Sequence, residues 1–316
     1  MRLKYGSALV TGGAGFIGTH LVDRLLENGF EVRVIDNLST GRLENISVHM
    51  NRKNFTFING DIRSLDDVKK VVKGVDVIFH EAAFVGVPQS VENPKLTNDV
   101  NVNGTLNLLE TSLKFDVHCF VYASSAAIYG EQEKIPIKED ATPHPNSPYA
   151  VSKLAAESYV ETYHKTYGLA TVCLRYFNVY GPRQMYGPYA AVITSFVNRL
   201  LKDKPPVIYG DGEQTRDFIN VRDVVDANML AIEKNVAGEI FNIATGTAVT
   251  INNLSEVLCS LMGKTEIQSV YDAPRKFDIR KSCGDISKAR EILGFKPKVS
   301  LEEGLLEFIK SWTAEN

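Results

Sequence analysis

Strand-like and helix-like hydrophobic patterns alternate through the first half of the chain. Short apolar runs of the buried-strand kind are followed by stretches in which apolar residues recur every three or four positions. Such alternation is typical of a parallel sheet whose strands are joined by crossover helices. The expected strands are residues 8–10, 31–36, 55–58, 75–79, 119–122 and 171–176, and the expected helices are residues 20–26, 64–72, 94–114 and 149–167.

The regularity loosens after about Asn178, where prolines interrupt the pattern. Further helices are expected at residues 193–201, 224–232, 286–293 and 300–312, and a further strand at residues 240–244. We therefore expect an α/β protein with two parts. Residues 1–177 would form a Rossmann domain with a doubly wound parallel sheet. Residues 178–316 would form a smaller C-terminal α/β substrate domain, some segments of which can return to the first, with a cleft between the two.

Three glycines, Gly12, Gly15 and Gly18, stand between the first expected strand and the first expected helix. Without a Cβ they let the backbone turn sharply and approach a pyrophosphate closely. The helix then points its unpaired N–H groups at the phosphates. The second expected strand ends in Asp36, whose carboxylate can accept hydrogen bonds from an adenosine ribose. The pattern indicates a dinucleotide site, although such a turn also occurs without a ligand.

Tyr149 and Lys153 form the strongest chemical signal, because positions i and i+4 of a helix lie on one face. A phenol with a pKa near ~10 is a poor base at neutral pH, and lowering that pKa by about three units needs roughly 4 kcal/mol. A nearby ammonium and an oxidised nicotinamide could supply this between them. Ser125, just after an expected strand, could hold the reacting oxygen beside Tyr149. The alternatives are a surface Tyr/Lys pair and a serine that bonds local backbone.

Composition adds few constraints. An apolar content of 44%, a charged content of 23% and a net charge of −3 are ordinary for a globular protein. They give no reason to expect nucleic acid or an anionic membrane as a partner. The four cysteines are scattered, which favours free thiols in a reducing compartment. No apolar run approaches the ~20 residues of a membrane helix. We therefore expect a cytoplasmic protein without a metal site.

Taken together, the motifs resemble those of the extended short-chain dehydrogenase/reductases, and specifically the nucleotide-sugar 4-epimerases of the UDP-glucose 4-epimerase type. The resemblance covers nearly the whole chain. The matching motifs are Thr11-Gly12-x-x-Gly15-x-x-Gly18 and the segments 36–41, 60–62, 80–83, 101–105, 124–130, 149–153, 175–183, 209–218 and 275–278.

The resemblance implies that NAD is the cofactor. Asp36 would receive the adenosine ribose, and a carboxylate there disfavours the 2′-phosphate of NADP. Arg33 and Arg42 lie near enough in sequence to leave NADP open. The residues expected to bind the cofactor are Gly12, Gly15, Phe16, Ile17, Gly18, Asp36, Asn37, Ser39, Thr40, Gly41, Asp61, Ile62, Ala82, Ala83, Asn101, Tyr149, Lys153 and Phe177.

The resemblance also implies a substrate site for a UDP-sugar. Arginine suits a diphosphate because its planar fork donates two parallel charge-assisted hydrogen bonds. A residue that limits the size of the sugar 2-substituent falls at Ser282, and its small side chain would leave room for an N-acetyl group. The residues expected to bind substrate are Ser125, Tyr149, Asn178, Arg216, Arg275, Asp278 and Ser282.

The resemblance therefore implies an isomerase that oxidises a UDP-hexose at C4, lets the 4-keto sugar turn, and reduces it on the other face. It would interconvert UDP-glucose with UDP-galactose and UDP-N-acetylglucosamine with UDP-N-acetylgalactosamine. Related dehydratases usually carry an acid just after the active-site serine, where this chain has Ala126 and Ala127. A UDP-glucuronate 4-epimerase, a net oxidoreductase and a non-catalytic cofactor-binding protein stay open. The family typically forms homodimers through the helices at residues 94–114 and 149–167.

Overall fold

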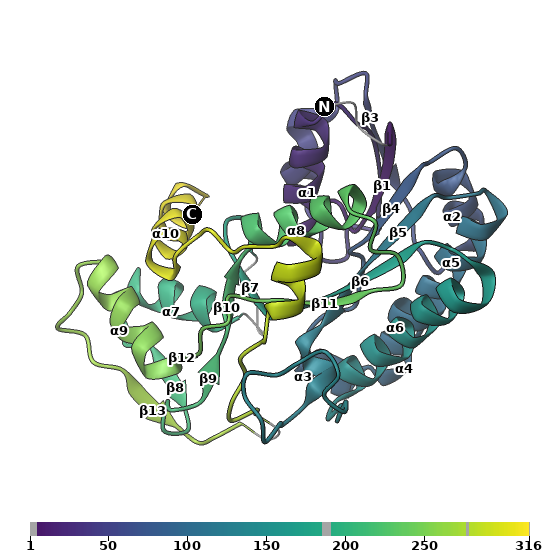
Figure 1. Cartoon of the computed structure of the whole chain (residues 1–316). Helices are drawn as coiled ribbons and strands as arrows, with labels where there is room; N and C mark the ends of the chain where they lie inside the picture. The colour runs from purple at the N-terminus through teal and green to yellow at the C-terminus, as the bar shows by residue number, and fades with distance from the viewer. Residues whose placement is uncertain (1–4, 185–190, 276–277, 316) are drawn as a thin grey trace.

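A seven-stranded parallel sheet forms the centre of the molecule (Figure 1). The computed structural model describes residues 5–184, 191–275 and 278–315. The strand order is β11-β6-β5-β4-β1-β2-β3, which is the doubly wound arrangement expected from the sequence. The strands are β1 Ser7–Thr11, β2 Glu31–Asp36, β3 Phe55–Asn59, β4 Val77–His80, β5 Cys119–Ser125, β6 Thr171–Tyr176 and β11 Ile240–Ile243.

Helices cover both faces of this sheet, and neighbouring strand residues enter different cores. Val10 packs with α1 and α8 on one face, whereas Leu9 packs with α2, α5 and α6 on the other. Burial on both faces explains why the strands read as continuous apolar runs rather than alternating ones. The helices on the sheet are α1 Phe16–Glu27 and α8 Val221–Glu233 on the first face, and α2 Leu65–Val72, α5 Gly104–Lys114 and α6 Pro148–Tyr167 on the second.

The helical stretch expected over residues 94–114 is interrupted by a wider turn. It consists of α4 Pro94–Asn98, the π-helical η2 Asp99–Asn103 and α5. Within η2, the Asn101 side chain bonds both backbone groups of Phe84 and also the hydroxyl of Ser152. π-Turns occur mostly as local insertions near functional sites. Here the turn brings an amide to the loop that follows β4.

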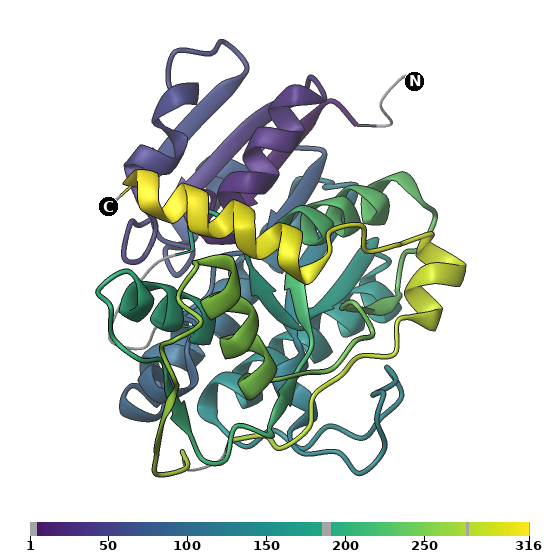
Figure 2. The ribbon, with the colours of Figure 1, turned by 90° about the vertical axis from the view of Figure 1, so that its left-hand side faces the viewer.

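The rest of the chain forms a smaller unit from short strand pairs and helices (Figures 1 and 2). Its core contains Tyr180, Phe196, Leu258, Phe308 and Trp312. The strands β7 Asn178–Tyr180 and β10 Phe218–Asn220 pair, as do β8 Val207–Tyr209 with β13 Val270–Asp272 and β9 Thr215–Arg216 with β12 Val249–Thr250. The helices are α7 Val192–Leu200, α9 Ile251–Leu261 and α10 Leu301–Glu315.

Two elements beyond residue 177 return to the large sheet. Strand β11 pairs with β6, and α8 packs beside α1. The helix expected over residues 286–293 is present: residues 287 and 288 are α-helical and continue into the π-helical η4 Ala289–Leu293. Ser300 caps α10 as expected, since its hydroxyl accepts a hydrogen bond from the Glu303 N–H. The Glu303 side chain does not complete a reciprocal capping box but pairs with Arg222.

Three short elements remain, namely η1 Leu43–His49, α3 Val87–Glu92 and η3 Ala126–Tyr129. Helix α3 and η3 both contact α6, so they lie beside the helix that carries Tyr149 and Lys153. Among the residues that the structure describes, every helix is too short or too polar to cross a bilayer.

Candidate active site

The glycine turn joins β1 to α1 at the carboxyl edge of the sheet, where ligands bind in open α/β folds. Gly12 has a φ of 68°, and a Cβ there would lie 2.8 Å from the backbone of Ala82. A Cβ at Gly18 would lie 2.2 Å from the Gly12 carbonyl oxygen. Only glycine fits at these two positions. The turn and the Ala82 backbone thus face each other closely, as a pyrophosphate cradle requires.

Asp36 ends β2 with a buried carboxylate that backbone hydrogen bonds hold in place. Its oxygens accept hydrogen bonds from the Ala14 N–H at 3.0 Å and the Leu38 N–H at 2.8 Å. Burial raises the pKa of Asp36. A Cβ at Gly41 would lie 2.8 Å from both carboxylate oxygens, so only glycine allows the loop after β2 to approach Asp36 this closely. The carboxylate thus lies where the resemblance places the adenosine ribose.

Arg33 does not point its charge at this site. Its guanidinium donates to the carbonyl oxygens of Val71 and Lys73, at the end of α2. An arginine that neutralised a 2′-phosphate would have to be free for that task. The arrangement therefore fits NAD better than NADP.

The other expected cofactor residues surround the same edge of the sheet. Asp61 accepts hydrogen bonds from Asn37 and Arg63, and the Arg63 hydrogen bonds lower the pKa of Asp61 to about 2. The Asn101 side-chain amide is hydrogen-bonded to the Phe84 backbone and to the Ser152 hydroxyl, so it orders the loop after Ala83. Phe16 and Ile17 begin α1, Ser39 and Thr40 lie in the loop after β2, Ile62 follows β3 and is buried, and Phe177 is buried after β6.

Ser125, Tyr149 and Lys153 are brought together by two adjacent elements. Ser125 ends β5, while Tyr149 and Lys153 lie one turn apart near the start of α6. Ser147 fixes this start, because its hydroxyl accepts a hydrogen bond from the Ala150 N–H at 3.2 Å. The Ser125 side chain lies beside the phenol of Tyr149, and it lowers the pKa of that phenol. Both side chains are half-buried.

The Lys153 ammonium is bound to the backbone of β5. It donates to the Ala123 carbonyl at 2.6 Å and lies 5.0 Å from the centre of the Tyr122 ring. Burial lowers the pKa of Lys153 to about 8. Burial also raises the pKa of Tyr149, and only the Ser125 hydrogen bond opposes this. Without a bound positive charge, Tyr149 is therefore a neutral phenol.

A buried ion pair beneath Lys153 was not singled out from the sequence. Glu157, one turn further along α6, receives hydrogen bonds from Arg175 at 2.7 and 3.0 Å and from Ser124 at 2.6 Å. Arg175 also donates to the Tyr129 hydroxyl and the Glu139 carbonyl. The side chains of Glu157 and Arg175 are 2% and 5% exposed. In the sequence, Glu157 and Arg175 each follow a run of apolar residues, and this position is the feature that could have indicated a buried ion pair.

Glu81 is a second carboxylate that sequence analysis passed over. It follows β4 inside the expected cofactor segment, and its Oε1 accepts a hydrogen bond from the Tyr176 hydroxyl at 2.9 Å. The Asn228 amide donates to the same hydroxyl at 2.7 Å. Burial raises the pKa of Glu81 to about 7. The sequence feature that could have indicated this site is the position of Glu81, an acidic residue directly after a buried strand.

The structure brings two of the expected substrate residues into direct contact. The Arg216 guanidinium forms an ion pair with Asp278 and also donates to the Ile279 carbonyl at 2.6 Å. The guanidinium of Arg275 lies 4.1 Å from the centre of the Tyr209 ring. Burial lowers the pKa of Arg216. The arginines and Asp278 thus lie on neighbouring strands and loops of the smaller unit.

Asn178 and Ser282 lie on segments linked by Asp217. The Asn178 N–H donates to the Asp217 carbonyl at 2.9 Å, and the Asp217 side chain accepts from the Gly284 N–H. Asn178 is exposed, whereas Ser282 is only 8% exposed. The Ser282 N–H donates a hydrogen bond of 3.4 Å to the Thr215 hydroxyl in β9. Ser282 is thus held next to the strand that carries Arg216.

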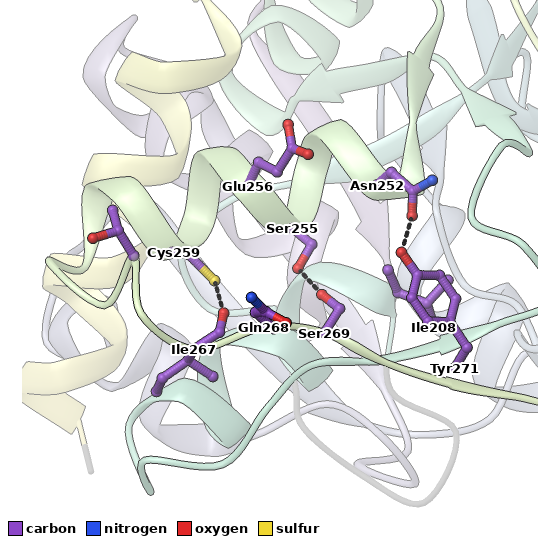
Figure 3. Close-up of a pocket in the computed structure, with 10 residues that line it drawn as sticks. Ile208, Asn252, Ser255, Glu256, Cys259, Ile267, Gln268, Ser269 and Tyr271 are labelled. Atoms are coloured by element: carbon purple, nitrogen blue, oxygen red, sulfur yellow. Dashed lines mark hydrogen bonds between the residues drawn. The ribbon is translucent and has the colours of Figure 1, made fainter.

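A cavity of about 430 Å³ lies elsewhere, between α9 and the segment before β13 (Figure 3). Its polar side chains bond one another, as in the Ser255–Ser269 and Asn252–Tyr271 pairs. Ile208 lines it, and because side chains alternate along a strand, the neighbouring Tyr209 with its Arg275 contact belongs to the other face. The ten residues that line the cavity include none of those expected to bind cofactor or substrate.

Comparison with known proteins places this geometry in a family. Residues 9–308 match the family described as GDP-mannose 4,6 dehydratase. A UDP-glucose 4-epimerase from Thermotoga maritima, solved with UDP-glucose, is 44% identical over 98% of this chain and 99% of its own, with a TM-score of 0.93. A UDP-N-acetylglucosamine 4-epimerase from Methanobrevibacter ruminantium, in complex with UDP-N-acetylmuramic acid, is 40% identical over 99% and 100%, with a TM-score of 0.94.

A third similar structure is the UDP-glucuronic acid 4-epimerase from Bacillus cereus in complex with UDP-glucuronic acid and NAD. It is 34% identical to this chain, covers 98% of it and 100% of its own length, and has a TM-score of 0.92. The likeness extends over the glycine turn, the helix with Tyr149 and Lys153, and the smaller unit alike. This chain belongs to the extended short-chain dehydrogenase/reductases, in the GDP-mannose 4,6 dehydratase family and among its nucleotide-sugar epimerases.

Proposed function

We propose that this protein is an NAD-dependent isomerase, a UDP-hexose 4-epimerase. It interconverts UDP-glucose with UDP-galactose and UDP-N-acetylglucosamine with UDP-N-acetylgalactosamine. The observation that carries the proposal is that Ser125, Tyr149 and Lys153 lie together at the sheet edge that also holds the Gly12 turn and the Asp36 carboxylate. The similar structures solved with UDP-sugars support the same substrate class.

Bound NAD would supply the hydride acceptor and, later in the cycle, the hydride donor at C4 of the sugar. The Gly12 turn, the Asp36 carboxylate and the Ala82 backbone would hold it. Tyr149 takes the proton of the sugar 4-hydroxyl and returns it after the sugar has turned. Ser125, which lies beside Tyr149, bridges the phenol and the reacting oxygen. The Lys153 ammonium stabilises the phenolate by its charge, which burial in this site makes effective.

The smaller unit provides two arginines, Arg216 and Arg275, that can bind the substrate diphosphate. Arg216 is paired with Asp278 in this structure, and an incoming diphosphate would compete for its guanidinium. Asp278 is then released to accept hydrogen bonds from the uridine ribose. Anchoring by the nucleotide leaves the 4-keto sugar free to rotate without leaving the cleft.

Dehydration is disfavoured because the residues after Ser125 are alanines. Ala126 and Ala127 form the start of η3, and the Ala127 N–H donates to the Ser125 hydroxyl at 3.2 Å. Neither side chain can donate or remove a proton at another sugar carbon. UDP-glucuronate remains the second candidate substrate, which the likeness to the Bacillus cereus enzyme supports, although Asn178 replaces the threonine typical of that group.

The function is tested by incubating the purified protein, without added NAD, with UDP-galactose or with UDP-N-acetylgalactosamine. Proton NMR of the anomeric signals reports conversion to the corresponding gluco sugars. Conversion of both supports the epimerase and a retained cofactor. Conversion of neither, even after NAD is added, contradicts the proposal, and UDP-glucuronate is then the next substrate to test.

Replacing Ser282 by tyrosine should suppress activity on UDP-N-acetylgalactosamine more than on UDP-galactose. The added ring would occupy the space that an N-acetyl group needs, while the smaller 2-hydroxyl still fits. The ratio of the two kcat/KM values measures this effect, and the retained UDP-galactose activity reports that the variant folds. Equal loss on both substrates would contradict a role of Ser282 in selecting the 2-substituent.

We also propose that the protein forms a homodimer through the face of α6 and its neighbours. Val151 and Tyr159 of α6 are 52% and 42% exposed, and Val91 of the adjacent α3 is 58% exposed. Apolar side chains gathered in this way mark an interface more often than a free surface. Light scattering should report a dimer for the wild type and a smaller particle for the Val151→Asp variant.

A further inference from the structure

Glu81 lies next to the strand position that anchors Lys153. Strands β4 and β5 run in parallel, with His80 opposite Tyr122. The residues that follow in the two chains are Glu81 and Ala123, and the Ala123 carbonyl accepts the hydrogen bond from Lys153. The backbone of Glu81 therefore starts one strand away from the bound ammonium.

The Glu81 carboxylate is held by a directed chain of hydrogen bonds. The buried Asn228 amide donates to the Tyr176 hydroxyl, which therefore turns its own proton towards Glu81 Oε1. Tyr176 and Asn228 are 6% and 0% exposed, so solvent does not compete for these bonds. A neutral donor chain that ends on a carboxylate favours its ionised form.

The charges around Lys153 balance only when the half-buried Glu81 is included. Two cations, Lys153 and Arg175, lie near two carboxylates, Glu157 and Glu81. Both oxygens of Glu157 are engaged by Arg175. Glu81, in contrast, accepts a bond from an uncharged phenol, so its negative charge stays available to the ammonium.

We propose that Glu81 is the counter-charge that keeps Lys153 protonated in the working enzyme, with Tyr176 holding its carboxylate in place. Glu81 is then a positioning residue that acts through Lys153. The proposal rests on the proposed 4-epimerase function.

Glu81 is the group near Lys153 that changes charge close to neutral pH. His80 stays a neutral imidazole, because burial lowers its pKa to about 3. The phenols of Tyr122 and Tyr176 stay neutral, because burial raises their pKa values well above the ordinary value. Tyr149, on the same helix as Lys153, is the proton-transfer group itself.

The consequence is a pH profile that depends on Glu81. The ammonium form of Lys153 is needed to stabilise the phenolate, so kcat falls as pH rises through the pKa of Lys153. Burial lowers this pKa, whereas the charges of Glu81 and Glu157 raise it. Removing the Glu81 charge should therefore move the alkaline limb of the profile to lower pH by about one unit, the order of shift that one nearby opposite charge produces.

The test compares pH profiles of kcat for UDP-galactose epimerisation. The Glu81→Gln variant keeps an oxygen that can accept the Tyr176 hydrogen bond, and its alkaline limb should move to lower pH with little change in KM. The matched control is Glu139→Gln, another carboxylate with a pKa raised by burial, which bonds the Asn242 N–H instead. Its alkaline limb should coincide with that of the wild type.

An unmoved alkaline limb in Glu81→Gln, or an equal displacement in the control, would overturn the counter-charge role. If Glu81→Gln does not fold by circular dichroism, Tyr176→Phe takes its place. That variant removes the hydrogen bond that lowers the pKa of Glu81. The pKa of Glu81 therefore rises, the carboxyl stays protonated up to a higher pH, and the alkaline limb should again move to lower pH. A wild type without epimerase activity would instead contradict the proposed function, so the two failures are distinguishable.

Discussion

Replacing Tyr149 by phenylalanine should lower kcat for epimerisation of UDP-galactose by about 10²–10⁴-fold, the usual contribution of a positioned acid or base. The phenol is the group that moves the proton of the 4-hydroxyl, and its partner Ser125 has no charge to replace it. Because phenylalanine keeps the ring, the packing of α6 is preserved. KM should change little, since the substrate is anchored by its nucleotide. Steady-state kinetics with both UDP-sugars measures the effect.

Tyr122 provides the control for this prediction. Its ring also lies beside Lys153, but its buried hydroxyl has no hydrogen-bond partner among the described residues. Tyr122→Phe therefore removes an oxygen that does no chemistry in the proposed mechanism, and it should keep near-wild-type kcat. If Tyr149→Phe retained activity comparable to that of Tyr122→Phe, proton transfer by Tyr149 would be excluded.

Replacing Glu157 by glutamine should lower the free energy of unfolding by about 3–5 kcal/mol, because it leaves a buried cation without its partner. The glutamine would leave Arg175 one amide oxygen besides the Tyr129 hydroxyl and the Glu139 carbonyl, but no negative charge. Since proteins are typically stable by only about 5–15 kcal/mol, this loss is large. The urea midpoint should fall clearly while the m-value stays constant.

Glu161→Gln is the matched control for this loss, because Glu161 lies one turn further along α6. It forms a surface pair with Lys165 at 3.2 Å, and such pairs contribute at most about 1 kcal/mol. A double variant, Glu157→Leu with Arg175→Met, removes both buried charges and should recover much of the stability. An equal midpoint for Glu157→Gln and Glu161→Gln would contradict the prediction.

Local geometry explains which parts of the site the sequence could predict. The separation of Tyr149 from Lys153 is set by one helical turn, so their common face follows from their spacing alone. The glycine turn is equally local, because Gly12 and Gly18 meet within one connection between β1 and α1. The strands of the large sheet were predictable because burial on both faces leaves continuous apolar runs.

Contacts between distant segments were not predictable in this way. Nothing near Glu81 in the sequence indicates Tyr176, which is 95 positions away, since the pair forms only when β4 and β6 enter one sheet. The same holds for Arg175 with Glu157 and for Arg216 with Asp278. The return of β11 to the sheet likewise depends on a crossover through α8.

The sequence by itself determined the Rossmann sheet, the glycine turn and the common face of Tyr149 and Lys153, because each follows from a periodicity or a short spacing. The tertiary structure placed Ser125 beside them and decided how these groups are charged. Burial raises the pKa of Tyr149, which keeps the phenol neutral, and it lowers the pKa of Lys153 to about 8. Burial and the approach of a counter-charge arise only from packing, so no linear pattern of residues can specify them.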